Sequence, residues 1–201
     1  MYTLYGTLAS RAFRVGWMLE ELGQPWDLVQ APPHSEAIYA VSKAGKIPAM
    51  VLDSGEVLTD SVAIMSFLAD RHGALTFAAG TPDRARQDAM LHRLNADMDG
   101  LLWAASLHSR ILPEEHRVPG VVESAKRAFG QSLADLAKDF EGPFLMGEVM
   151  TPADMLATHC LGWARMAGFP LENDTMMTYA KSMTRRDAYR SAREKMAPPE
   201  G

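Results

Sequence analysis

A short segment near the N-terminus carries side chains that could bind and stabilise an anion. It offers three hydroxyls, from Tyr5, Thr7 and Ser10, and a guanidinium from the next residue, Arg11. A helix is predicted to begin here, and a helix N-terminus attracts anions because it carries partial positive charge and free N–H groups. The simpler interpretation is that Ser10 caps the helix and Arg11 is a solvated surface charge, because serine is a common capping residue.

A second candidate is Gly45-Lys46-Ile47-Pro48, immediately before a predicted strand. Proline at a strand start usually marks an edge or a bend, and most X–Pro bonds are trans. In a cis bend, by contrast, the N–H and C=O of Ile47 would be left to pair with an extended peptide, as an added strand does. Both interpretations stay open on these residues alone.

Two good capping residues, Asp60 and Ser61, open the next predicted helix. Capping is again the simpler interpretation. The same position offers N–H groups and a hydroxyl to a carboxylate, while Asp60 could accept from an ammonium group. That combination matches the head group of an α-amino acid, and all three candidates would lie at one edge of one small sheet.

Alternating strands and helices position these candidates. A strand at Tyr2–Tyr5, a helix over 11–22 and a strand at Trp26–Val29 predict a βαβ unit with a right-handed crossover. Two further apolar runs, Ala49–Leu52 and Val57–Thr59, flank a Ser-Gly turn and predict a hairpin, which a third helical segment follows.

The rest of the chain predicts helices alone. Residues 75–83 are interpreted as a linker, and one long helix is predicted over Arg84–Leu112. Thr151-Pro152-Ala153-Asp154 is a strong helix start, with Thr as N-cap, Pro first in the helix and Asp placed as in a capping box. The predicted fold class is therefore an α/β domain (βαβ-ββα) followed by an all-α domain.

Composition excludes several classes of function. The 201 residues carry a formal net charge of −5 without basic runs, which argues against nucleic acid or anionic membrane as a partner. The single cysteine, Cys160, excludes an internal disulfide and a cysteine-based zinc cluster. Neither a transmembrane segment nor a signal-peptide pattern is apparent, so we expect a cytoplasmic protein. No cluster of metal-ligating residues is apparent either, so we expect no bound metal.

At the candidate sites the sequence resembles the glutathione S-transferases, with a pattern like that of bacterial members, over nearly the whole chain. The matching segments are specific in their order and spacing: Ser10–Gly23, Gly45–Ala49, Leu58–Ile64 and Gly147–Asp154. The resemblance implies a thioredoxin-like, glutathione-binding domain over 1–74. It further implies an all-α domain over 84–201 that supplies an electrophile pocket and dimer contacts, and usually a homodimer.

The resemblance also implies roles for the candidate residues. Pro48 should follow a cis bond, and the Ile47 backbone should pair with the cysteine of glutathione. Asp60 and Ser61 should hold the γ-glutamyl group of glutathione.

Two cations and an apolar set complete the implied site. Arg11 and Lys46 are candidates for the glycyl carboxylate or for the dimer edge. The electrophile pocket would be lined by residues of the long helix, each of which could equally be ordinary core between domains: Trp103, Leu107 and Ile111.

The residue that activates the thiol does not transfer directly from the family. Members use Tyr, Ser or Cys near the first strand, and without a cysteine there a glutathionyl-transfer mechanism is not expected. Ser10-Arg11 matches many bacterial members, whereas Tyr5 lies near the tyrosine of Tyr-type members. We rank Ser10 first, Tyr5 second and Thr7 third.

The predicted function is a glutathione transferase, of the kind used in detoxification, that takes glutathione as co-substrate and attacks a small apolar electrophile. Lowering the thiol pKa of about 8.5 by roughly two units requires about 2.7 kcal/mol. One hydroxyl hydrogen bond to a charged acceptor supplies about 1.5–3 kcal/mol, and the helix terminus about 0.3–1. Two alternatives stay open: a glutathione-dependent peroxidase or disulfide reductase, and a glutathione-binding or scaffold protein without turnover.

Overall fold

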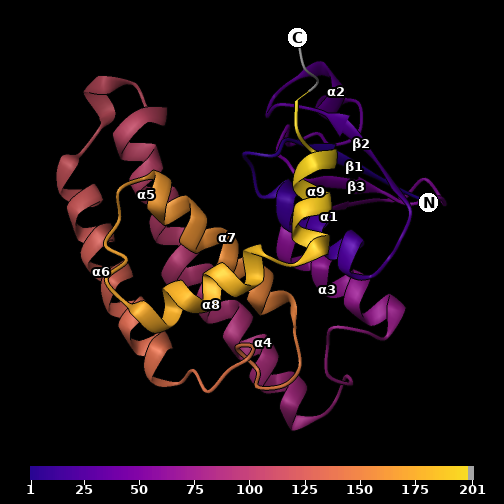
Figure 1. Ribbon diagram of the computed structural model, residues 1–201. Coiled ribbons are helices and arrows are strands. Elements are labelled where there is room, and N and C mark those ends of the chain that lie inside the picture. Colours follow the sequence, from indigo (N-terminus) through magenta and orange to yellow (C-terminus); the bar gives the residue numbers. More distant parts are fainter. Residues whose placement is uncertain (199–201) are drawn as a thin grey trace. The chain divides into compact units, whose positions relative to one another are not determined.

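The computed structural model describes residues 1–198, which form two compact units. The first unit contains Met1–Ala78 and the described residues from Thr184 onward, and the second contains Ala79–Met183. Within the described chain, all four strands belong to the first unit, whereas the second is built from helices (Figure 1). The last three residues of the predicted all-α range, 199–201, lie outside the described part.

The sheet has the strand order β2-β1-β3-β4. The central strand β1 pairs in parallel with β2 and antiparallel with β3, which in turn pairs antiparallel with β4. This confirms the predicted thioredoxin-like order βαβ-ββα. The strands are β1 (Tyr2–Gly6), β2 (Trp26–Gln30), β3 (Ala49–Val51) and β4 (Val57–Thr59).

Four helices accompany the sheet in the first unit: α1 (Ala12–Glu21), α2 (Glu36–Tyr39), α3 (Ser61–His72) and α9 (Asp187–Lys195). Helix α1 is buried along most of its length, because it packs against β1, α3 and α9. The start of α1 and the start of α3 therefore belong to one continuous core, which fixes the two helix N-termini that the sequence singles out.

Helix α9 packs on α1, although the sequence places it with the helices that precede it. Arg186 holds Glu21 through two hydrogen bonds of 2.6 and 2.8 Å. The ring of Tyr189 meets the rings of Phe13 and Trp17 edge-on, each with centroids 5.0 Å apart. An ion pair and an aromatic cluster thus attach the end of the chain to the first unit.

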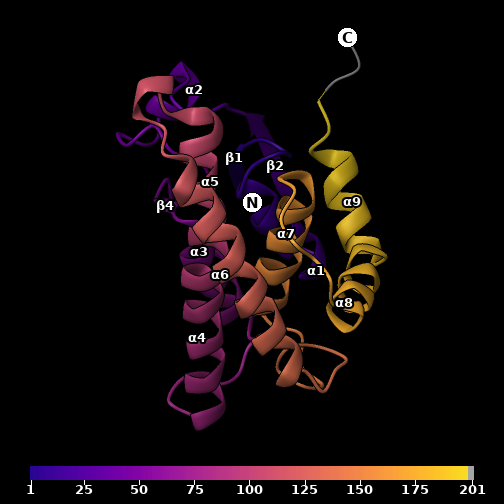
Figure 2. The same cartoon turned by 90° about the vertical axis from the view of Figure 1, so that its left-hand side faces the viewer.

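The second unit begins with one continuous helical run over residues 82–111, as predicted, but two π-helical turns interrupt it. Helix α6 packs along this run, on α5 and on both π-helical segments (Figure 2). No helix in residues 1–198 is long and apolar enough to cross a membrane. The elements are α4 (Pro82–Leu94), η1 (Asn95–Asp99), α5 (Gly100–Ser106), η2 (Leu107–Ile111), η3 (Glu114–His116), α6 (Pro119–Lys138), α7 (Pro152–Met166) and α8 (Asp174–Thr184).

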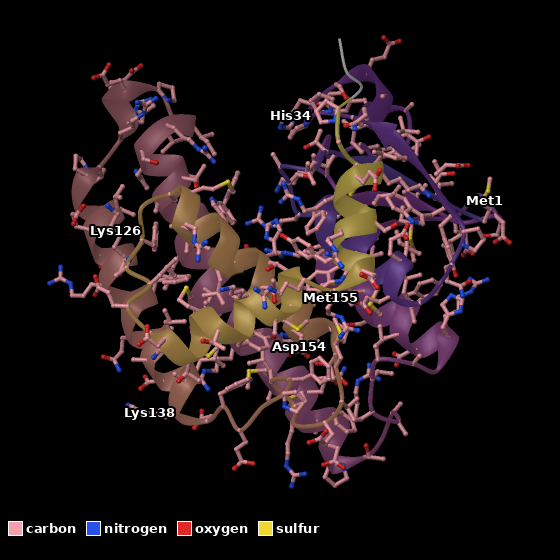
Figure 3. The ribbon with its side chains drawn as sticks, in the orientation of Figure 1. Met1, His34, Lys126, Lys138, Asp154 and Met155 are labelled. Carbon is pink, nitrogen blue, oxygen red and sulfur yellow. The ribbon has the colours of Figure 1, made fainter. Side chains whose placement is uncertain are left out.

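The predicted capping box at the start of α7 is confirmed. Asp154, labelled in Figure 3, accepts from the Thr151 N–H at 2.8 Å, the Leu145 N–H at 2.8 Å and the Tyr179 hydroxyl at 2.8 Å. Burial raises the pKa of Asp154, while the hydrogen bonds from Leu145, Thr151 and Tyr179 oppose that rise. One buried carboxyl group therefore joins the start of α7, the preceding loop and α8.

Candidate functional site

The strand register brings the three candidate segments to one end of the sheet. Tyr5 near the end of β1 lies opposite Ala49 at the start of β3, and Ala49 lies opposite Thr59 at the end of β4. The loop after β1, the residues before β3 and the start of α3 therefore emerge side by side. The prediction that they share one sheet edge is confirmed by this pairing.

The Ile47–Pro48 peptide bond, immediately before β3, is cis, as the resemblance implied. The Ile47 side chain packs against a cluster formed by Ala31, Ile38 and Ala49. Its main-chain N–H and C=O have no hydrogen-bond partner within the described chain. Since the side chain is held by the core, the backbone of Ile47 is left for a ligand.

The N-terminus of α3 combines a carboxylate, a hydroxyl and free N–H groups. Asp60 Oδ1 accepts from the N–H groups of Val62 at 2.9 Å and Ala63 at 3.0 Å, so Asp60 is the N-cap. The Asp60 side chain is exposed, and its Oδ2 accepts no hydrogen bond from the residues described. That oxygen can accept from an ammonium group, and the first N–H of the helix can donate to a carboxylate.

Ser61 is almost fully buried, and its hydroxyl has a partner that the sequence analysis did not assign. The Nη1 group of Arg14 donates to Ser61 Oγ at 3.3 Å. Arg14 is fully buried in α1. The only signal for this in the sequence is its place in the Ser10–Gly23 segment, because a charged residue on a helix is more often exposed.

Ser10 is half-buried, and its hydroxyl closes a turn. Ser10 Oγ donates to the Thr7 carbonyl at 2.8 Å and accepts from the Ala12 N–H at 3.2 Å. The helix N-cap is Arg11, one residue later than the sequence suggested. The Ser10 oxygen thus lies at the start of α1, where the helix dipole favours a negative charge.

Tyr5, the second candidate for thiol activation, packs in an apolar cluster, whereas Ser10 lies at the start of α1. In β1, Tyr2, Leu4 and Gly6 are buried while Tyr5 is half-buried, and the Tyr5 side chain packs on the cluster that also receives Ile47. The Tyr5 hydroxyl makes no hydrogen bond to any described residue. A Cβ on Gly6 would lie 2.2 Å from Ala12 Cβ, so this glycine lets the end of β1 touch the start of α1.

The loop that leads into Lys46 is braced by two rings that the sequence analysis did not identify. His34 Nδ1 lies 3.0 Å from the Tyr39 hydroxyl, and the His34 N–H donates to the Gly45 carbonyl at 2.8 Å. Gly45 has φ 62°, and a Cβ there would lie 2.6 Å from His34 Nδ1. Gly45 was the one feature of the sequence that could have indicated this close contact. Its left-handed backbone and its contact with the His34 imidazole both require glycine. Lys46 itself is exposed.

The residues predicted for an electrophile pocket belong to the second unit. Trp103 in α5 is 41% exposed and Ile111 in η2 is 49% exposed, while Leu107 is half-buried. Both exposed side chains are accessible on this unit taken by itself. His108 accepts from the Val118 N–H at 3.2 Å and so has a structural partner.

Residues 10–71 match the family model of the glutathione S-transferase N-terminal domain, which covers all three candidate segments from Ser10 onward. The chain is also 30% identical over 115 residues to Glutathione S-transferase 3 of Schizosaccharomyces pombe. The N-terminal part of this chain is therefore similar in sequence to the glutathione S-transferases. The match covers 52% of this chain and 46% of that relative, so the chain spans about half the length of that protein.

Solved structures of glutathione S-transferases share the fold of this chain. A glutathione transferase from Methylococcus capsulatus superposes with a TM-score of 0.87 at 22% identity, covering 96% of this chain and 98% of that one. A sphingomonad glutathione S-transferase complexed with glutathione gives 0.82 at 25% identity, covering 96% and 97%. Ure2p in complex with glutathione gives 0.85 at 17% identity, covering 96% and 94%.

Within residues 1–198, no group of three or more His, Cys, Asp or Glu side chains could hold a metal ion. The polar groups gathered at the sheet edge are hydroxyls, backbone amides and one exposed carboxylate. These groups suit an organic anion that also carries an ammonium group.

Proposed function

We propose that this protein is a glutathione transferase that binds glutathione at the sheet end and uses its thiol as a nucleophile. One observation carries the proposal. The Ile47 main chain, the start of α3 and the Ser10 hydroxyl lie at the ends of three neighbouring strands. A γ-linked tripeptide has an amino acid head, a peptide centre and an anionic tail, and this edge offers a group for each.

The tripeptide is proposed to lie along the edge with its cysteine paired to the Ile47 main chain. Its γ-glutamyl ammonium donates to Asp60, and its α-carboxylate accepts from Ser61 at the start of α3. Its glycyl carboxylate lies near Lys46, with Arg11 as the second candidate cation.

Thiol activation is assigned to Ser10. The bound thiol loses its proton to solvent, and the Ser10 hydroxyl turns from the Thr7 carbonyl to donate a hydrogen bond to the thiolate. The sulfur then forms a bond to an electrophilic carbon, whose leaving group departs with the electron pair. Ser10 stabilises the thiolate and takes up no proton, so it acts by hydrogen bonding and not as a base.

The electrophile is proposed to be small and apolar, and to contact Trp103, Leu107 and Ile111. Trp103 and Ile111 are exposed, and an apolar ligand that covers them removes apolar surface from water, which is favourable. A homodimer, which the resemblance implies, and a cytoplasmic location, which the sequence pattern predicts, stay predictions.

One alternative has an observation in its favour. The Ser10 hydroxyl already donates to Thr7, and a protein that keeps this bond with glutathione present would bind the tripeptide without activating it. The other alternative, a glutathione-dependent peroxidase or disulfide reductase, would use the same binding residues and differs only in the second substrate.

Binding and turnover separate these functions. We expect retention on immobilised glutathione, elution by free glutathione, and conjugation of 1-chloro-2,4-dinitrobenzene. Lys46→Ala should weaken binding of glutathione by roughly 2- to 5-fold, the usual cost of removing one charge partner at an exposed site. Lys126→Ala, on α6 in the second unit (Figure 3), is the matched control and should leave binding unchanged.

The other outcomes are equally informative. Retention with turnover of a hydroperoxide or a mixed disulfide alone would support the peroxidase or reductase. Retention without any turnover would support a binding protein. A chain that passes through the immobilised glutathione unretained would contradict the proposal itself.

A further inference from the structure

A buried cation lies directly behind the proposed γ-glutamyl site. Arg14 is 0% exposed, and Nη1 of its guanidinium donates to Ser61 Oγ at 3.3 Å. The contact joins α1 to the first residue of α3, two helices that pack against each other in the first unit. Its neighbours along α1 are apolar, since Phe13 and Val15 are buried as well.

The chemistry of this pair fixes the direction of one proton. Arginine is always charged and has no acceptor, so the serine oxygen must accept in this bond. The Ser61 proton therefore points to a different group, and no described residue accepts it. A hydroxyl that accepts from a cation is also a stronger donor, because hydrogen bonds in a chain polarise one another.

The start of α3 places this donor next to an exposed N-cap residue. Ser61 is 2% exposed, but its neighbour Asp60 is exposed and caps the same helix. The Ser61 hydroxyl and the first N–H groups of α3 are both donors at one point, and a carboxylate is the group that accepts from both. Asp60 supplies an acceptor beside them, as an α-amino acid head group requires.

We propose that Arg14 is a positioning residue that makes the Ser61 hydroxyl a donor to the α-carboxylate of the γ-glutamyl group. This inference rests on the proposed function, because it deepens the assignment of that site to glutathione. Arg14 acts through Ser61 and does not touch the ligand. It selects for peptides whose first residue carries a free α-carboxylate.

A stability role alone would not require this residue. A buried charge contributes little net stability compared with a well-packed apolar side chain of similar volume. Selection of a carboxylate is a property that only the charged, hydrogen-bonded side chain provides.

The test compares two ligands on the full-length protein by calorimetry. One is glutathione, and the other is the analogue in which 4-aminobutyryl replaces γ-glutamyl, which lacks only the α-carboxylate. The wild type should bind glutathione more tightly than the analogue. In Arg14→Met the dissociation constant of the analogue divided by that of glutathione should fall by roughly 5- to 10-fold. This is less than the effect of losing a whole hydrogen bond to a charged group, because the Ser61 hydroxyl remains and loses only its orientation. Damage that is only structural would weaken both ligands equally and leave the ratio unchanged.

A matched control and a second variant test whether the effect is specific to the Arg14 side chain. Arg186→Met removes another arginine of the first unit, whose partner Glu21 lies at the far end of α1, and should leave the ratio unchanged. Arg14→Gln removes the charge but keeps an amide donor, and should lower the ratio by roughly threefold, less than Arg14→Met because one donor remains. If Arg14→Met does not fold, Arg14→Gln decides the question.

The possible failures are distinguishable. A wild type that binds neither ligand would overturn the proposed function and this inference with it. A wild type that binds both ligands equally, or an unchanged ratio in the folded Arg14 variants, would overturn the inference about Arg14 alone.

Discussion

Ser10→Ala is expected to lower kcat/KM for 1-chloro-2,4-dinitrobenzene by about 10- to 100-fold. The lost hydrogen bond to the thiolate is worth about 1.5–3 kcal/mol, and each 1.36 kcal/mol is a factor of ten in rate. The dissociation constant for glutathione should change by less than about threefold, because the other proposed contacts remain. Steady-state kinetics and calorimetry measure the two quantities separately.

The pH profile of this variant provides a second readout. Without the hydroxyl the pKa of the bound thiol should rise, so activity lost near neutral pH should return as the pH is raised. Tyr5→Phe is the matched control, since it removes the hydroxyl of the second candidate, and should keep most activity. Loss of activity in Tyr5→Phe together with normal activity in Ser10→Ala would move the role to Tyr5.

Asp154→Ala should lower the free energy of unfolding by about 3–5 kcal/mol. The carboxylate accepts from Thr151, Leu145 and Tyr179, and removing it leaves buried donors that each cost about 1–3 kcal/mol when unsatisfied. Loss of the helix cap adds about 1 kcal/mol, and relaxation or water entry reduces the total. Urea unfolding monitored by circular dichroism measures the change.

Two further variants calibrate this prediction. Tyr179→Phe removes one of the donors to Asp154 and should cost about 1–2 kcal/mol, since that hydrogen bond is lost and the buried carboxylate keeps fewer donors. Asp135→Ala removes an exposed carboxylate on α6 that pairs with Lys138, and should leave the unfolding midpoint nearly unchanged. A similarly small change for Asp154→Ala would show that the buried network does not stabilise the fold.

Local chemistry made much of the fold predictable. Gly23 and Gly73 mark the ends of α1 and α3, and Thr151 with Asp154 marks the start of α7. The Ser54-Gly55 turn likewise indicated the β3–β4 hairpin. These signals lie within a few residues of the features that they determine, so one sequence is sufficient to detect them.

Contacts distant in sequence were not predictable in this way. Helix α9 joins the first unit because Arg186 meets Glu21, which is 165 residues away. The two π-helical turns in the run over 82–111 were also missed, because a π-helical turn has no distinctive pattern of apolar residues.

The candidate site likewise combines features that local sequence predicts with contacts that depend on tertiary packing. The positions of Ile47, Asp60 and Ser61 at one end of the sheet were predictable because each belongs to a strand or helix boundary. The bond from Arg14 to Ser61 and the contact of His34 with Gly45 depend on tertiary packing. The engagement of Ser10 with the Thr7 carbonyl is local, but several turn geometries were compatible with the same residues.

The central claim is that one tripeptide contacts the Ile47 main chain, the start of α3 and the start of α1 together. Titrating glutathione into the 15N-labelled protein and following backbone amide signals by NMR tests this most directly. The account predicts that the amides of Ile47, Ser61 and Ala12 shift together and saturate with one dissociation constant. It would be contradicted if these signals stayed in place at millimolar glutathione, or if only amides of the second unit moved.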